Sequence, residues 1–192
     1  DGDYNLEIII SYTDLSGRCV FEVYSCEGEQ KYQITGDVGT WQPGLFINNK
    51  LVIPYKNNTT GSIALYKFDG TNWAKENNYD MGEAKTTENA AFCDIDSNGI
   101  YEYVFGKKVI NENGITNTTV TTKLQAIQGT LDYAISDMNK DGKAEIVGFE
   151  TKKNGSGKAG VHLFTTAGSA SLYNTGIDEN NTTWDWSICD LR

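Results

Sequence analysis

Acidic and amide side chains recur at alternate positions in two short segments of this 192-residue chain. Both segments follow the pattern D-x-[DN]-x-[DN]-G-x-x-E. Calcium takes about six to eight oxygen ligands, and the glycine at position six permits a sharp bend that turns the side-chain oxygens toward one centre. A backbone carbonyl at position seven adds another ligand. The pattern predicts two calcium sites: Asp94, Asp96, Asn98, the Ile100 carbonyl and Glu102, and Asp137, Asn139, Asp141, the Lys143 carbonyl and Glu145.

Ordinary turns are the alternative for these segments, because Asp, Asn and Gly also form tight loops by hydrogen-bonding their own backbone. Two matches in the same register favour metal binding. EF-hand and dockerin-like loops share the first six positions but continue into helices, whereas the strand-like run Ile146–Phe149 follows Glu145. Magnesium is disfavoured because it demands stricter octahedral geometry and retains its waters. Each segment carries three carboxylates that repel one another, so calcium is expected to stabilise the fold.

Partial copies of the pattern stand at both ends of the sequence. Asp1, Asp3 and Glu7 fit positions three, five and nine, and Asp190 fits position one. Joining the two ends would place Arg192 at position three, which suits a cation poorly. A metal site formed by these four acidic residues would therefore be an imperfect one.

Strand-like segments flank both loops, which places the loops at hairpin turns. The two copies are 43 residues apart, and a degenerate copy without the acidic residues is predicted at Trp41–Tyr55, as strand, tight turn and strand. No segment shows helical periodicity, so no helix is predicted. The repeats continue with further strand-like runs, at Cys19–Tyr24 and Lys31–Ile34, at Ser62–Phe68 and near Trp73, and at Gly160–Thr165 and Ser171–Tyr173.

Four short strands in each repeat of about 40–50 residues are typical of a β-propeller blade. The repeats resemble the FG-GAP/VCBS repeats of integrin-α-like propellers, in the Asp-rich loop and in the Glu145–Gly148 run after it. The resemblance implies an all-β propeller whose blades have four antiparallel strands, with calcium in the loop between the first two strands. It also implies ligand recognition by loops of the other face, and an extracellular or cell-surface location.

The blades are predicted at residues 1–38, 39–85, 86–129 and 130–180, with residues 181–192 starting or closing a further blade. Two arrangements remain open. In one, the chain is part of a larger propeller, typically seven-bladed in this family, and the usual size of these propellers favours this reading. In the other, Thr183–Cys189 pairs with Leu6–Ile10 and closes a four-bladed ring, which would leave no open sheet edge.

Composition excludes several classes of partner. The net charge of −10 argues against nucleic acid, whose phosphates need clustered Lys and Arg, and against an anionic membrane surface. No apolar run approaches the ~20 residues that cross a membrane. The four cysteines lack CxxC spacing and predict neither a zinc site nor a redox motif. The single histidine, His162, lies in a strand-like run and is expected to be packed or solvated.

The sequence contains no G-x-S-x-G elbow, P-loop or H-E-x-x-H segment. The leading hypothesis is a calcium-stabilised binding or adhesion propeller, not an enzyme, that recognises a glycan or an extracellular protein. Its rivals are the propeller portion of a polysaccharide-degrading enzyme, and a structural unit that contacts neighbouring blades or subunits; fold analogy does not choose among them. Trp41, Trp73, Trp184 and Trp186 could stack on sugar rings if exposed, but packing within or between blades is favoured for each of them. Of the four, Trp73 is the best candidate for exposure, because it follows the polar turn at 69–72.

Overall fold

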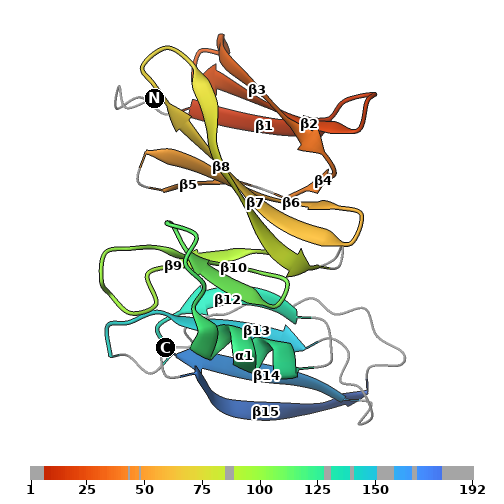
Figure 1. The fold of residues 1–192 in the computed structure, drawn as a ribbon, viewed down its shortest axis with the longest axis vertical. Helices are drawn as coiled ribbons and strands as arrows, with labels where there is room; N and C mark the ends of the chain where they lie inside the picture. The colour runs from red at the N-terminus through yellow and green to blue at the C-terminus, as the bar shows by residue number, and fades with distance from the viewer. Residues whose placement is uncertain are drawn as a thin grey trace. The chain divides into compact units, whose positions relative to one another are not determined.

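The computed structural model describes residues 7–42, 44–47, 49–84, 89–127, 131–138, 141–150, 158–165 and 168–178. Within these residues the chain is predominantly β, and its strands form four antiparallel sheets, none of them closed (Figure 1). The chain divides into two compact units, Asp1–Asp80 and Met81–Arg192. In the described part, no helix has the length and apolar character needed to span a membrane.

The first sheet of the first unit is a three-stranded meander. It consists of β1 (Glu7–Thr13), β2 (Arg18–Ser25) and β3 (Gln30–Val38), with β2 in the centre. Asp14 shapes the first hairpin, because its carboxylate accepts hydrogen bonds from the backbone N–H groups of Ser16 and Arg18. The predicted strands at 19–24 and 31–34 are confirmed by the pairing of β2 with β3.

The second sheet contains β4 (Thr40–Trp41), β5 (Leu45–Ile47), β6 (Lys50–Asn57), β7 (Thr60–Phe68) and β8 (Trp73–Glu83), the last of which ends in the second unit. Its order is β4-β6-β7-β8, and β5 also pairs with β6. The short strands β4 and β5 thus share one neighbour and occupy successive parts of one edge. The β5–β6 hairpin confirms the strand, turn and strand predicted for the degenerate repeat.

One face of each sheet in the first unit is buried against the other. Phe21 and Ile34 of the first sheet pack in a cluster with Ile53 and Tyr66 of the second. Trp41 stacks on Tyr55, with ring centroids 4.1 Å apart. Burial of these apolar surfaces supplies the main stabilisation of the unit.

The second unit also contains two sheets. The third sheet has the order β11-β10-β9, from β9 (Ala91–Cys93), β10 (Glu102–Phe105) and β11 (Lys108–Asn111). The fourth runs in chain order, from β12 (Leu131–Ser136) through β13 (Glu145–Glu150) and β14 (Lys158–Thr165) to β15 (Gly168–Asp178). The last two confirm the strands predicted at 160–165 and 171–173. Val104 and Val109 of the third sheet share a core with Tyr133, Ile146 and Phe164 of the fourth.

A helix, α1 (Thr118–Ala126), follows the third sheet, so the expectation of an entirely strand-built repeat was wrong here. Asn117 caps the helix by accepting a hydrogen bond from the N–H of Val120 at 3.1 Å. Val120 and Leu124, four residues apart and fully buried, hold one face of the helix in the core of the second unit. Tertiary packing thereby overrides the modest helix propensity of a threonine-rich segment.

Trp73 is packed, as was favoured for every tryptophan, although it was the best candidate of the four for exposure. It is half-buried, it packs against the core of the first unit, and its indole Nε1 is buried without a hydrogen-bond partner among the described residues. Phe68 lies at 5.4 Å and Phe46 at 6.0 Å between ring centroids. Trp41 is packed, as expected, whereas Trp184 and Trp186 lie outside the described residues.

Candidate metal centre

The loop at 94–102 joins β9 to β10 and is folded by its own acidic residue at position one. The Asp94 carboxylate accepts hydrogen bonds from the N–H groups of Asn98 at 2.9 Å and Gly99 at 2.8 Å. Gly99 has a φ of +83°, a left-handed conformation that glycine adopts without steric cost. Ser97 also has a positive φ, of +58°. The chain therefore turns back on itself within a few residues.

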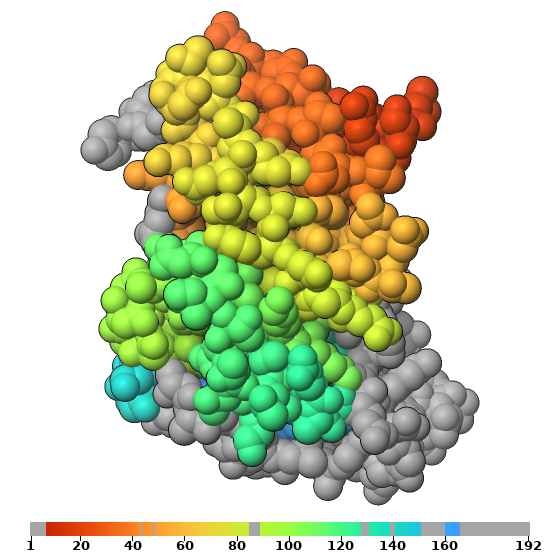
Figure 2. All heavy atoms as spheres, viewed as in Figure 1, coloured from red at the N-terminus to blue at the C-terminus, as the bar shows by residue number. Residues whose placement is uncertain are grey.

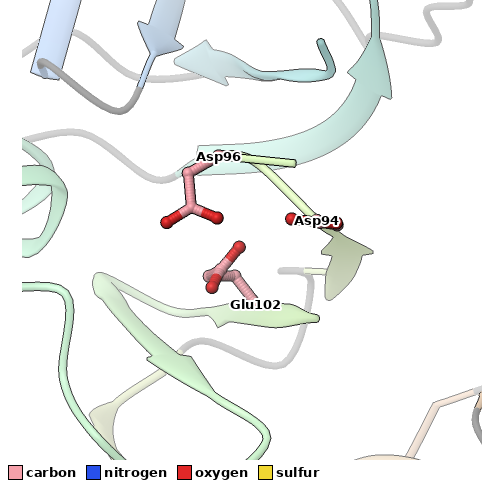
Figure 3. A group of neighbouring side chains, drawn as sticks. All are labelled: Asp94, Asp96 and Glu102. Carbon is pink, nitrogen blue, oxygen red and sulfur yellow. The ribbon is translucent and has the colours of Figure 1, made fainter. Parts of the chain in front are cut away.

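This turn brings three carboxylates together. Asp94, Asp96 and Glu102 each offer an oxygen, and these oxygens all lie within 4.8 Å of one another (Figure 3). Asp94 and Asp96 come from the loop, whereas Glu102 is the first residue of β10. No other group of three or more His, Cys, Asp or Glu side chains with this geometry occurs among the described residues.

Glu102 is the buried member of the cluster, and its pKa is raised. The side chain is buried, with 5% relative exposure, and it accepts a hydrogen bond from the N–H of Ile95 at 2.9 Å. The pKa of Glu102 is raised from 4.5 to about 7, mainly because burial disfavours the charged form. The hydrogen bond from Ile95 opposes this rise, and the neighbouring charges of Asp96 and Asp94 contribute to it. A cation placed among these oxygens would favour the ionised form of Glu102.

The other two predicted ligands of this loop lie in the same turn. Asn98 is exposed, and its side-chain oxygen accepts a hydrogen bond from the N–H of Ile100 at 2.7 Å. Ile100 is half-buried and lies two residues before β10 begins. Their placement within the loop is compatible with a coordination shell that draws on both side-chain and carbonyl oxygens.

The second loop, between β12 and β13, repeats the same hydrogen bonds. Asp137 accepts from Asp141 at 3.1 Å and from Gly142 at 2.9 Å, Asp141 accepts from Lys143 at 2.9 Å, and Glu145 accepts from Met138 at 2.8 Å. Gly142 has a φ of +85°, as Gly99 does in the first loop. The two loops are thus built alike at the positions that the structure describes in both.

The carboxylates of the second loop, however, do not form a group like that of the first. Asp137 and Asp141 are exposed, whereas Glu145 is buried at 2% relative exposure. The predicted ligand Asn139, at position three, lies outside the described residues. The first loop has an aspartate, Asp96, at this position, whereas the third carboxylate of the second loop is Asp141 at position five.

The imperfect third site lies almost entirely outside the described residues, because Asp1, Asp3 and Asp190 are not among them. Glu7, the first residue of β1, has its carboxylate 3.7 Å from the ammonium of Lys31 on β3. Within the described part of the first unit, Glu7 is therefore next to a basic side chain.

A buried ionisable pair in the fourth sheet was missed by the sequence analysis. Nε2 of His162 on β14 lies 2.9 Å from the carboxylate of Glu150 on β13, and both residues are buried. His162 also stacks on Phe164, with ring centroids 6.0 Å apart. The expectation that His162 is packed is met, but no spacing rule links it to Glu150, because the contact depends on the pairing of two strands.

Comparisons with known proteins give one informative likeness. No protein-family profile matches the chain, and no curated protein matches it significantly. Among solved structures, the chain is similar to the crystal structure of the exotype rhamnogalacturonan lyase YesX, with a TM-score of 0.57 and 16% sequence identity. The likeness covers 85% of this chain but 31% of the lyase chain. At this identity the likeness concerns the fold.

Proposed function

We propose that this chain is a calcium-stabilised β-propeller module that recognises polysaccharide. The observation that carries the proposal is the convergence of Asp94, Asp96 and Glu102 within 4.8 Å. One member of this cluster is a buried carboxylate, and burial of a negative charge is unfavourable unless a positive charge or hydrogen bonds offset it. A bound cation would supply the missing positive charge.

Calcium suits this cluster better than the common alternatives. Its ligands are hard oxygens, it tolerates irregular geometry, and it accepts carbonyl and amide oxygens beside carboxylates. Zinc favours Cys and His ligands, whereas the three clustered side chains are all carboxylates. Because the loop ties β9 to β10, calcium binding would stabilise the third sheet and the core it shares with α1.

Recognition of polysaccharide is supported by the fold. The enzyme whose structure this chain resembles is, by its name, a rhamnogalacturonan lyase, and the likeness covers 31% of the lyase chain. A second candidate function rests on the same likeness: the chain is the propeller portion of a polysaccharide-degrading enzyme. The two differ in whether the chain alone binds polysaccharide or also changes it.

Thermal unfolding with calcium and with EGTA tests the metal site. Calcium should raise the unfolding temperature of the native chain by about 5 °C or more at saturating concentration. Asp96→Asn should abolish most of that rise. Asp69→Asn is the matched control, because Asp69 also accepts two backbone N–H groups in a turn but belongs to no carboxylate cluster among the described residues. Equal responses to calcium in all three proteins would contradict the proposal.

The polysaccharide arm is tested with the same native protein. Binding to a panel of neutral and acidic plant and bacterial polysaccharides should be detectable by affinity electrophoresis, with no loss of polymer length after prolonged incubation. Polymer shortening, or new unsaturated ends absorbing in the ultraviolet, would instead establish the second candidate. Retardation by none of the polymers would contradict both.

A further inference from the structure

The face of the first sheet that is turned away from the core carries a carboxylate on its central strand. Phe21 of β2 packs into the core of the first unit, so its neighbour Glu22 points to the opposite face. In the strand pairings, Glu22 stands between Ile10 of β1 and Gln33 of β3. Both of these neighbours are exposed, and the red and orange atoms of the sheet lie at the surface of the first unit in Figure 2. This outer face is therefore accessible to a partner.

Three neutral side chains hold the Glu22 carboxylate in place. Its Oε1 accepts hydrogen bonds from the hydroxyl of Tyr12 and from Nε2 of Gln33, both at 3.0 Å. Its Oε2 accepts one from the hydroxyl of Tyr24 at 2.7 Å. A carboxylate has about four acceptor sites, so one site on Oε2 remains for a further donor. The hydrogen bonds, that of Tyr24 above all, also lower the pKa of Glu22, so the carboxylate is ionised at neutral pH.

The negative charge of Glu22 has no cation beside it among the residues that the structure describes. The first sheet contains two basic side chains, and both are paired elsewhere. Arg18 lies 3.1 Å from the carboxylate of Asp14. Lys31 lies 3.7 Å from the carboxylate of Glu7. The neutral donors disperse the charge of Glu22 without cancelling it, so a positively charged donor at Oε2 would form a strong, charge-assisted hydrogen bond.

Apolar side chains surround this charge on the same face. Ile8, Ile10 and Tyr12 stand at alternate positions of β1, and each is about half exposed. Tyr24, opposite Ile8 in the pairing, is half-buried. Exposed apolar patches of this kind are typical of protein interaction sites. A protein partner fits the patch better than a sugar, because a sugar stacks on the tyrosines alone, whereas an apolar side chain also packs on the isoleucines.

We propose that the outer face of the first sheet binds a protein partner that presents an arginine among apolar residues, with the guanidinium on Oε2 of Glu22. Arginine suits this site better than lysine, because its planar, weakly hydrated guanidinium donates an N–H group while it stacks on a tyrosine ring. The net charge of −10 attracts a basic partner. A second copy of this chain is a poor source of the arginine, because Arg18 is already held by Asp14. The inference goes beyond polysaccharide recognition and does not depend on it.

NMR titration with two capped peptides tests the inference. The probe is acetyl-Thr-Ile-Arg-Ile-Thr-amide, and its counterpart carries citrulline, which keeps the shape of arginine but not its charge. At protein concentrations where the chain is monomeric, the arginine peptide should shift the backbone amide signals of Tyr12, Glu22 and Tyr24. It should bind at least about tenfold more tightly than the citrulline peptide. This comparison uses the native protein, so it does not depend on the folding of a variant.

Glu22→Gln should weaken binding of the arginine peptide about tenfold, to the affinity of the citrulline peptide. Glu27→Gln is the matched control, because it removes the same charge from the exposed turn between β2 and β3, and it should leave the affinity unchanged. Equal affinities of the native protein for the two peptides, or an unchanged affinity in Glu22→Gln, would overturn the inference. Shifts of the same amide signals by a neutral polysaccharide but not by the arginine peptide would also overturn it, and would assign this face to glycan recognition.

Discussion

At the scale of single residues, Glu102 links calcium binding to pH. Its pKa of about 7 in the metal-free protein lies above its ordinary value of 4.5, because burial disfavours the charged form. The metal-free fold therefore loses stability from this group as pH rises between those two values, since the unfolded chain ionises more readily. The metal-free fold favours the protonated carboxyl of Glu102, whereas calcium binds the ionised carboxylate and displaces the proton.

Calcium affinity should consequently rise steeply between about pH 6 and pH 8. Isothermal titration calorimetry at several pH values, in buffers of different ionisation enthalpy, would show the affinity and the proton released. Glu102→Gln should weaken binding at every pH and remove the proton release. An affinity that stays constant across this range in the native protein would contradict the raised pKa of Glu102, and an unchanged affinity in Glu102→Gln would show that Glu102 is not a ligand.

The buried pair of Glu150 and His162 is expected to contribute to the stability of the fourth sheet. Both side chains are buried, at 3% and 7% relative exposure, and 2.9 Å separates the two polar atoms. His162→Ala removes the imidazole partner from a buried carboxylate and leaves a cavity beside Phe164. The free energy of unfolding should fall by about 3 kcal/mol, as urea denaturation would measure. His162→Gln, which retains a hydrogen-bond donor, should cost less; a loss below about 0.5 kcal/mol for the alanine variant would contradict the role assigned to the pair.

At the scale of elements, α1 depends on its cap and on two buried residues. The side chain of Asn117 satisfies the N–H of Val120, one of the donors that a helix start leaves unpaired. Asn117→Ala should therefore lower the free energy of unfolding by about 1 kcal/mol, measured by chemical denaturation. Asn113→Ala is the control, because Asn113 is exposed and precedes the helix. Equal stability of the two variants would mean that α1 contributes nothing to the cooperative unit.

The elements also show which features a sequence reveals. The Asp-rich loops were predictable because their fold is local: Asp94 and Asp137 each bond the two backbone N–H groups four and five residues ahead. The helix was not predictable from its own threonine-rich residues, because Val120 and Leu124 are its apolar anchors and their partners come from the sheets of the second unit. The packing of Trp73 on Phe46 and Phe68 likewise depends on strands brought together by the fold.

At the scale of the whole molecule, each unit has a core of its own. Phe21 and Ile53 belong to the core of the first unit, and Val104 and Phe164 to that of the second. Every core joins the faces of two sheets, so each sheet is stable through its neighbour rather than alone. The repeat in the sequence predicted the sheets, since the alternation of apolar residues marks the faces that must be covered. The propeller arrangement itself stays a prediction.

The edge strand β1 of the first sheet lacks such cover on both of its faces within the described residues. The strand β1 pairs with β2 alone there, and Ile8, Ile9, Ile10 and Tyr12 are each about half exposed, at 54%, 46%, 47% and 43%. An apolar edge strand with unpaired backbone groups is a template for pairing with another strand. We therefore expect the chain to self-associate as its concentration rises.

Sedimentation velocity over a range of protein concentrations tests this expectation. The double variant Ile8→Lys and Ile10→Lys should remain monomeric at concentrations where the native chain forms larger species, because lysine on an edge strand opposes pairing by charge and by desolvation. Ile115→Lys is the matched control, since Ile115 is 65% exposed but lies in a loop of the second unit. If the double variant and the native chain sediment alike, β1 is not the associating edge, and its exposed isoleucines contribute to no contact between copies.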